Sequence, residues 1–485
     1  MGMGVIKHGV TVELSQGIIQ GKVDSTVSGV AFYSFQGIPY AQPPVGDLRF
    51  KAPQGAPSWE GVKDASSVGS SCSMSEDFLY INVYSPQLPS GNETNSLLPV
   101  MVWIHGGGFN VGSGSPSLYG PGFLLEKEIL LVTFNYRLGA LGFLGLSHSE
   151  VSLNNGLKDQ RAALRWVQQN IERFGRDPTR VTLFGESAGG VSIEYQLISP
   201  STSGLFQRAI SGSGSVLNPW AYVDHASAQT RAQQLAKLLG CTVEDNNVVY
   251  NFLMEASSDG LVFLPTVEDE TGSGGDVFLP ATPLEILKSG NFNHVPYITG
   301  FCSLEGKAWV AVELNTTSAL ANNATEAAHM PPVLWDELNN NFESFLPYDL
   351  NLTIGTNESQ QVAALVKKFY FGNETASLAT IEHLVNVWAV HGDDLNYLFT
   401  TTYFNYTEFE NNSTEMKTVR RMVTLWTNFA KSQELGEGLD LTWNPIGESK
   451  QTYLDINTEL SVQNLLELHP ERSAFWDGLY SEVDN

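Results

Sequence analysis

The residues best suited to chemistry in this sequence form one pentapeptide, Gly185-Glu186-Ser187-Ala188-Gly189. It follows an apolar run at residues 181–184 and precedes residues 188–198, which can form a helix. Glycines on both sides of a serine let a strand turn sharply into a helix, and the turn exposes the hydroxyl group above the sheet. Backbone N–H groups at a helix N-terminus are unpaired and can stabilise the oxyanion that forms when a carbonyl is attacked. The pattern therefore predicts that Ser187 is a nucleophile that attacks a carbonyl carbon.

A second motif lies upstream of the serine, where an apolar strand at residues 102–104 runs into Gly106, Gly107 and Gly108. Such a turn can aim several N–H groups at one point, as binding of an oxyanion requires. Alone, the glycines are explained equally well by a tight turn without function. The order is informative, because hydrolases place the glycine loop before the nucleophile.

Together with further blocks, these motifs resemble the carboxylesterase/cholinesterase family of the α/β-hydrolase superfamily. The blocks are residues 75–84 (SEDFLYINVY), 135–139 (NYRLG), 156–160 (GLKDQ) and 174–178 (FGRDP). The resemblance runs from about Gly17 to Tyr480, and residues 157–220 are most similar to insect carboxylesterases. It implies an α/β-hydrolase fold with a mostly parallel central sheet flanked by helices, and a single carboxylesterase-type domain over residues 1–485.

The resemblance also implies a catalytic triad. A serine hydroxyl needs a base to take its proton, and the base needs an orienting acid. Glu305 follows an apolar stretch at residues 295–300 and matches the acid of the family, although on composition alone it reads as a solvated loop carboxylate. His391 stands in a His-Gly-Asp-Asp-Leu block and matches the base. The chain order Ser187, Glu305, His391 is that of this superfamily.

Other roles follow from the resemblance alone. The N–H groups of Gly107, Gly108 and Ala188 are the implied oxyanion donors. Glu186 matches a residue that can raise the basicity of the histidine or hold a water, with a packed polar neighbour as the alternative, and Ser213 matches a serine that hydrogen-bonds the acid. An ion pair between Glu76 and Arg137 is expected beneath the glycine loop.

The chain departs from the family before His391. Family members have several tens more residues there, including a strand that leads toward the histidine, whereas this chain has only residues 373–390. Residues 384–390 can form a replacement strand or a helix end. The shortened segment makes the position of the base uncertain, and misplacing a catalytic group by about 1 Å can lower the rate about a hundredfold.

Composition excludes several classes of protein. The chain has 485 residues, of which 42% are hydrophobic, and its strand–helix alternation shows no linker. The net charge of −26 argues against nucleic-acid partners and anionic membrane surfaces. No apolar run is long enough to span a membrane, and no residues have metal-ligand spacing. The resemblance implies a small-molecule ester as partner and no cofactor, and we expect no metal.

Cysteines and sequons point to different compartments. The usual disulfide partners of Cys72 and Cys241 in the family are replaced near Phe78 and Phe252, so these cysteines and Cys302 are expected to be free. Nine sequons predict a secreted, extracellular glycoprotein with an exposed region at residues 315–412. A cytoplasmic protein with unmodified sequons is the alternative, and residues 1–4 contain no signal-peptide core.

Two classes of function fit these observations. Intact Ser187, Glu305 and His391 favour a serine carboxylesterase, whereas the shortened segment favours a non-catalytic adhesion or binding member of the same fold family. A narrower alternative is juvenile hormone esterase, which usually has glutamine at the position of Glu186. A cholinesterase is disfavoured, because residues 65–75 contain no tryptophan to stack on a quaternary ammonium.

Overall fold

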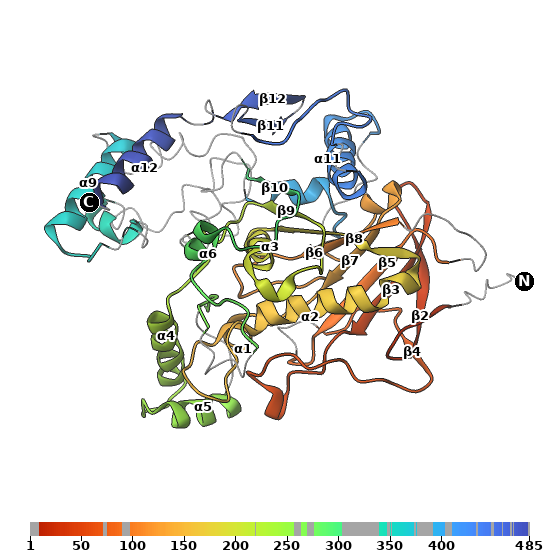
Figure 1. Cartoon of the computed structure of the whole chain (residues 1–485), viewed down its shortest axis with the longest axis horizontal. Helices are drawn as coiled ribbons and strands as arrows, with labels where there is room; N and C mark the ends of the chain where they lie inside the picture. Colours follow the sequence, from red (N-terminus) through yellow and green to blue (C-terminus); the bar gives the residue numbers. More distant parts are fainter. Residues whose placement is uncertain are drawn as a thin grey trace, which may run out of the picture. The chain divides into compact units, whose positions relative to one another are not determined.

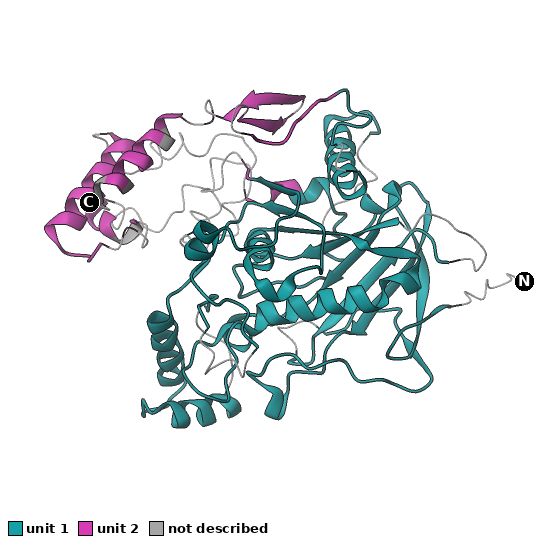
Figure 2. Cartoon of the chain, in the orientation of Figure 1, with its two compact units in different colours: residues 1–300, 395–440 teal, residues 301–394, 441–485 magenta. Residues whose placement is uncertain are grey.

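The computed structural model describes residues 9–70, 75–89, 98–218, 220–256, 263–268, 276–302, 339–346, 350, 352–372, 375, 391–402, 410–432, 435–447, 451–457, 459–465, 468 and 470–483. The chain divides into two compact units, which Figure 2 distinguishes by colour. Unit 1 comprises Met1–Gly300 and Leu395–Asp440, and unit 2 comprises Phe301–Asp394 and Leu441–Asn485. The expectation of a single domain over residues 1–485 stays a prediction.

Unit 1 is built on a mixed sheet, in which the described residues form ten strands (Figure 1). The strand order is β1-β2-β3-β5-β7-β6-β8-β9-β10, and β4 pairs with β2. The strands are β1 (Val10–Glu13), β2 (Ile18–Ser25), β3 (Ala31–Pro39), β4 (Val62–Asp64), β5 (Tyr80–Ser85), β6 (Leu98–Ile104), β7 (Leu130–Phe134), β8 (Arg176–Glu186), β9 (Arg208–Gly212) and β10 (Tyr297–Gly300).

The half of the sheet from β7 to β10 is parallel throughout, whereas β1, β2, β3, β5 and β7 pair antiparallel. β6 and β7 are apolar almost without alternation, as expected for parallel strands that are buried on both faces. The register pairs Trp103 with Phe184 and Ile104 with Gly185. The carboxyl ends of β6 and β8 therefore lie side by side, at the edge where open α/β sheets bind ligands.

Helices and 3₁₀ turns connect the strands of unit 1. They are η1 (Gly46–Leu48), η2 (Leu124–Lys127), α1 (Gly139–Phe143), α2 (Asn155–Asn170), η3 (Ile171–Phe174), α3 (Ala188–Ile198), η4 (Pro200–Thr202), α4 (His225–Leu238), α5 (Asn246–Glu255), α6 (Pro283–Ser289) and α11 (Thr414–Lys431). Side-chain caps mark several starts, including Asp224 at α4, Asp245 at α5 and a capping box of Thr282 and Glu285 at α6. Within the described part of the chain, no helix combines the length and apolar character needed to cross a membrane.

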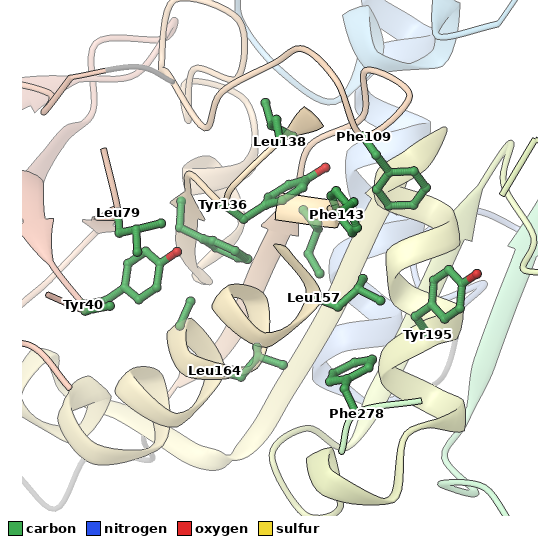
Figure 3. Packing of buried hydrophobic residues seen from close by; sticks show 14 of the residues in the cluster. Tyr40, Leu79, Phe109, Tyr136, Leu138, Phe143, Leu157, Leu164, Tyr195 and Phe278 are labelled. Atoms are coloured by element: carbon green, nitrogen blue, oxygen red, sulfur yellow. The ribbon is translucent and has the colours of Figure 1, made fainter. Parts of the chain in front are cut away.

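The main core lies between the sheet and the helices α2 and α3 (Figure 3). Leu157 and Leu164 of α2 and Tyr195 of α3 are fully buried in it. Phe109, which follows the glycine loop, packs edge to face on Phe143 of α1 with ring centroids 5.1 Å apart. This packing gives the glycine loop after β6 a rigid support.

Unit 2 contains η7 (Phe342–Phe345), α9 (Asn357–Phe371), β11 (Thr452–Ile456), β12 (Leu460–Asn464) and α12 (Pro470–Val483). β11 and β12 form an antiparallel pair. Phe369 of α9 stacks on Phe475 of α12 with ring centroids 4.1 Å apart. The boundary between the units falls inside η9 (Asp393–Tyr397), because Asp394 belongs to unit 2 and Leu395 to unit 1.

Candidate active site

The predicted nucleophile lies at a sharp turn between a strand and a helix. β8 ends at Glu186, Ser187 follows, and α3 begins at Ala188. Ser187 has φ 59° and ψ −127°, a backbone conformation that costs a non-glycine residue about 1–3 kcal/mol. The turn is held because the N–H of Ser187 donates to the carbonyl of Gly212 at 2.9 Å, and its carbonyl accepts from the N–H of Val191 at 2.9 Å. The strand–turn–helix predicted from the pentapeptide is therefore present.

The glycines on both sides of the turn are required by close backbone approach. A Cβ atom at Gly189 would lie 2.0 Å from the carbonyl oxygen of Ile104, and one at Gly185 would lie 2.6 Å from the backbone of Gly189. Atoms cannot approach so closely, so only glycine lets α3 begin against β6. Ser187 is thereby held next to β6, the strand that precedes the glycine loop.

The glycine loop follows β6 and lies beside Ser187. A Cβ atom at Gly106 would lie 2.9 Å from the Cβ atom of Ser187. Gly107 has φ 107°, and a Cβ atom there would lie 2.0 Å from the carbonyl oxygen of Val111. Gly108 has φ 61°, and a Cβ atom there would meet no protein atom within 4 Å. The loop therefore leaves space at Gly108 for an atom of a bound molecule.

Three N–H groups at this place have no hydrogen-bond acceptor among the described residues: those of Gly107, Gly108 and Ala188. The N–H of Ala188 is also at the N-terminus of α3, where the helix dipole contributes partial positive charge. Donors that are not engaged by protein can bind an oxygen on which negative charge develops. The arrangement is chemically able to bind an oxyanion next to Ser187.

Glu186 and Ser213 flank this turn. Glu186 is buried, and its charge adds to the effect of burial in raising the pKa of the Tyr119 hydroxyl. Ser213 follows β9 with φ 53°, and its N–H donates to the carbonyl of Gly300 at 2.7 Å. Because Gly300 ends β10, Ser213 lies at the start of the segment that leads to Glu305.

His105 stabilises the start of the glycine loop by a hydrogen bond and by ring stacking. It is fully buried and stacks on Tyr136, with ring centroids 4.4 Å apart. Its Nδ1 hydrogen-bonds the carbonyl of Gly106 at 2.8 Å, which assigns the proton to Nδ1. Burial lowers the pKa of His105 to about 4, so the ring is uncharged at neutral pH.

The prediction of an ion pair between Glu76 and Arg137, both of which are described, is wrong. Arg137 binds the buried Asp159 with both ends of its guanidinium, through Nε–Oδ2 at 2.8 Å and Nη2–Oδ1 at 2.7 Å. The backbone N–H of Arg137 donates to the same carboxylate at 3.0 Å, so Asp159 satisfies three donors that would otherwise be buried without acceptors. Glu76 is 34% exposed and pairs with Arg49 at 3.1 Å.

A second buried ion pair lies on α2 and was not predicted from the sequence. Lys158 Nζ lies 2.8 Å from Glu268 Oε2, and both side chains are 0% exposed. Asn154 Nδ2 donates to Glu268 Oε1 at 2.7 Å, and Lys158 Nζ donates to Ser152 Oγ at 2.9 Å. The pair ties residues 263–268 to the start of α2. The sequence contained a signal for buried ion pairs, because Lys158 and Asp159 are adjacent charged residues in a helix with an apolar face.

Four aromatic side chains meet next to both motifs, and we call them the aromatic cluster: Trp103, Tyr119, Phe184 and Phe399. The ring of Phe399 lies 4.7 Å from Trp103, 5.3 Å from Tyr119 and 5.8 Å from Phe184, measured between ring centroids. Trp103 and Phe184 are 5.0 Å apart. This cluster was not predicted from the sequence, although an aromatic residue stands three positions before both Gly106 and Ser187.

The structure describes only part of the predicted site. Ser187, the three N–H donors, Glu186 and Ser213 belong to unit 1. His391 belongs to unit 2 and is half-buried, whereas Glu305 and residues 376–390 lie outside the described residues. The replacement strand at 384–390 lies outside them too. The triad therefore stays a prediction.

The described cysteines, Cys241 and Cys302, form no disulfide bond, and the described acidic groups form no metal site. Cys302 Sγ lies 3.8 Å from Asp394 Oδ1, whereas Cys72 lies outside the described residues. Phe78 is fully buried and Phe252 packs against the main core, so both replacements are apolar packing residues. Across the described ranges, no group of three His, Cys, Asp or Glu side chains could hold a metal ion.

A model of the carboxylesterase family matches residues 8–388 and 368–476 of this chain. The two matched segments overlap at residues 368–388, directly before His391. The break in the match therefore falls in the interval where the sequence predicts missing residues.

Similar proteins include insect esterases. A carboxylic ester hydrolase of Bombus ignitus is 35% identical over 403 residues, which cover 77% of this chain and 69% of the relative. A juvenile hormone esterase of Tribolium castaneum is 32% identical over 541 aligned residues, covering 96% of this chain and 91% of the relative. Because that alignment is longer than the 485-residue chain, this chain lacks residues that the relative has.

A solved structure has the same fold over almost the whole chain. It is the crystal structure of juvenile hormone esterase from Manduca sexta with OTFP covalently attached, with a TM-score of 0.83 and 25% identity. The match covers 98% of this chain and 100% of that chain. The predicted α/β-hydrolase fold is thereby confirmed.

Proposed function

Because the chain belongs to the carboxylesterase family, we propose that it hydrolyses carboxylic esters through an acyl-enzyme, with Ser187 as the nucleophile. The observation that carries the proposal is the strained turn at Ser187 next to three unengaged N–H groups. Backbone strain at a residue with a side chain persists only where the surrounding structure imposes it, and such positions cluster at active sites. Here the strain at Ser187 is imposed by neighbouring atoms that approach Gly185, Gly189 and Gly106 too closely to leave room for a side chain.

In the first half-reaction, Ser187 Oγ attacks the ester carbonyl carbon while His391 Nε2 takes its proton. The oxyanion of the tetrahedral intermediate accepts hydrogen bonds from the N–H groups of Gly107, Gly108 and Ala188. His391 then gives the proton to the alcohol oxygen, the carbon–oxygen bond to the alcohol breaks, and the acyl group stays on Ser187.

In the second half-reaction, water replaces the alcohol. His391 takes a proton from the water as its oxygen attacks the acyl carbon, and returns it to Ser187 Oγ as the acid leaves. Glu305 accepts the hydrogen bond from His391 Nδ1–H and stabilises the transient imidazolium. The carboxylate of Glu186 also favours this cation, and Ser213 supports Glu305 by a hydrogen bond.

The test is hydrolysis of p-nitrophenyl esters of increasing acyl length. The parent protein should turn over several of them, and Ser187→Ala should lower the rate by about 10⁴-fold or more. Ser203→Ala is the matched control, since Ser203 is an exposed serine at the end of η4 and should behave as the parent. A parent rate no higher than that of Ser187→Ala contradicts the esterase and leaves the non-catalytic binding protein as the function.

The narrower candidate, a juvenile hormone esterase, is favoured by the two similar juvenile hormone esterases and disfavoured by Glu186. Adding juvenile hormone to the substrate series separates it from a general esterase. A kcat/KM for juvenile hormone well above that for every p-nitrophenyl ester supports the narrower function. A lower value contradicts it.

The protein is further proposed to be a secreted glycoprotein. Three of the sequon asparagines lie among the described residues, and all three are exposed: Asn357, Asn411 and Asn412. Expression through a eukaryotic secretory pathway should give a protein that loses mass on treatment with peptide N-glycosidase. An unchanged mass contradicts this assignment and favours the cytoplasmic alternative.

A further inference from the structure

Residues 399–402, which follow His391 in the chain, pair with residues 117–120 inside unit 1. Gly120 and Thr400 exchange two backbone hydrogen bonds, from Gly120 N–H to the Thr400 carbonyl at 2.8 Å and from Thr400 N–H to the Gly120 carbonyl at 3.1 Å. Thr402 N–H donates to the Ser117 carbonyl at 2.9 Å. A Cβ atom at Gly120 would lie 2.7 Å from the carbonyl oxygen of Thr400, so only glycine lets the two segments approach this closely.

Phe399 makes the side-chain part of this anchor. It is 0% exposed, and its ring contacts Trp103, Tyr119 and Phe184. Trp103 and Phe184 are register partners on adjacent parallel strands, so their side chains leave the same face of the sheet. One phenylalanine therefore contacts the strand that leads to the glycine loop and the strand that leads to Ser187.

The anchor limits where His391 can be. Phe399 follows His391 by eight positions, and an extended chain of that length spans at most about 28 Å. The 3₁₀ turns of η9 over Asp393–Tyr397 shorten this reach to roughly 22 Å. Further hydrogen bonds from Leu398 N–H and Phe399 N–H to the Leu395 carbonyl, at 3.1 and 2.9 Å, tighten the connection.

We propose that Phe399 is a positioning residue: packed on Trp103 and Phe184, it holds the His391 segment from its downstream end, in place of the upstream residues that this chain lacks. The proposal rests on the esterase function proposed above, because it concerns the base of that reaction. It accounts for a family member that keeps the histidine block while losing residues before it. In the aromatic cluster, β6, β8 and the segment that follows η9 share one packing site within unit 1.

The test uses Phe399→Ala, Phe399→Leu and a matched control, Phe174→Ala. Phe174 is also a fully buried phenylalanine of unit 1 with two aromatic neighbours, Phe35 and Trp166, but it lies in η3 at the opposite end of β8. The measurements are kcat and KM for a p-nitrophenyl ester, the rate at which an organophosphate labels Ser187, and hydrogen exchange of residues 391–402.

We expect Phe399→Ala to lower kcat and the labelling rate about a hundredfold, with KM within about threefold of the parent. Exchange in residues 391–402 should rise about tenfold or more. Phe399→Leu keeps most of the packing and should recover most of the rate. Phe174→Ala should lower thermal stability comparably, while leaving kcat and the exchange of residues 391–402 unchanged.

Unchanged exchange in residues 391–402 of Phe399→Ala overturns the anchor, whatever the activity. If the parent is active, an unchanged kcat in Phe399→Ala also overturns the proposal. If Phe399→Ala does not fold, Phe399→Leu and Phe174→Ala are compared by the same measurements, with a smaller rise in exchange expected for Leu. Failure of the esterase itself gives a different result, namely a parent no faster than Ser187→Ala.

Discussion

Unit 1 and unit 2 carry different parts of the proposed reaction, and they are built differently. In unit 1 the proposed nucleophile Ser187 and the glycine loop end adjacent parallel strands above an extensive core of fully buried side chains. In unit 2 a small cluster of buried residues lies among the described elements: Leu350, Val362, Val366 and Leu479. Backbone N–H donors and a strained serine need a rigid sheet, whereas a base and an acid can be delivered by side chains on connecting segments.

The largest effect expected from this comparison concerns the base. His391→Ala should lower ester turnover by about 10⁴-fold or more, because Ser187 then has no proton acceptor, and Glu305→Ala should lower it by a similar or smaller factor. Steady-state hydrolysis of a p-nitrophenyl ester measures both. His294→Ala is the control, since His294 is exposed and bonds locally to the Gly290 carbonyl. If His391→Ala and His294→Ala have the same small effect, His391 is not the base.

The second prediction concerns the close contacts in unit 1. Gly189→Ala should destabilise the protein by about 3 kcal/mol or prevent folding, because its Cβ atom would lie 2.0 Å from the Ile104 carbonyl oxygen. Gly55→Ala is the matched control, since nothing lies within 4 Å of a Cβ atom there. Urea unfolding of both variants measures the difference. Equal stability would contradict the account of the turn.

The third prediction is a pH dependence of stability that comes from His105. Its folded-state pKa of about 4 lies below the usual 6.5, so the unfolded state binds more protons between these values. The stability contributed by the neutral ring is therefore present above pH about 6.5 and is lost as the pH falls toward about 4. At pH 5 the loss should be about 2 kcal/mol relative to pH 7.5.

The measurement compares the free energy of unfolding of the parent and of His105→Gln at pH 7.5 and pH 5. The difference between the two proteins isolates His105 from the many carboxylates that also titrate. The variant should be the less stable protein at pH 7.5, and its deficit should shrink by about 2 kcal/mol at pH 5. A deficit that stays constant would mean that His105 is protonated alike in both states.

The smallest effect concerns unit 2. Gly478 is exposed in the interior of α12, and a Cβ atom there would meet nothing within 4 Å. Gly478→Ala should therefore stabilise the helix by about 0.5–1 kcal/mol. Thermal unfolding should show a small rise in the melting temperature and unchanged ester turnover. Destabilisation would show that the side chain of residue 478 meets a surface of the folded protein.

Features that depend on local sequence could be predicted, whereas contacts between distant segments could not. The turn at Ser187 was predictable because glycines at positions 185 and 189 are a local requirement, and α3 spans residues 188–198 as the sequence analysis expected. The partner of Arg137 could not be predicted, because Glu76 and Asp159 both offer a carboxylate and only the folded backbone selects between them. Phe399 was overlooked, since its contacts with Trp103 and Phe184 join segments far apart in the sequence.

The measurement that tests the central claim most directly is the mapping of an organophosphate adduct by mass spectrometry, in the parent and in His391→Ala. If Ser187 is activated by His391, the parent should carry the adduct on Ser187 and lose ester turnover in proportion to its occupancy. His391→Ala should be labelled orders of magnitude more slowly. An adduct on another residue, or no adduct while hydrolysis continues, would contradict the assignment of Ser187, and equal labelling rates would contradict that of His391.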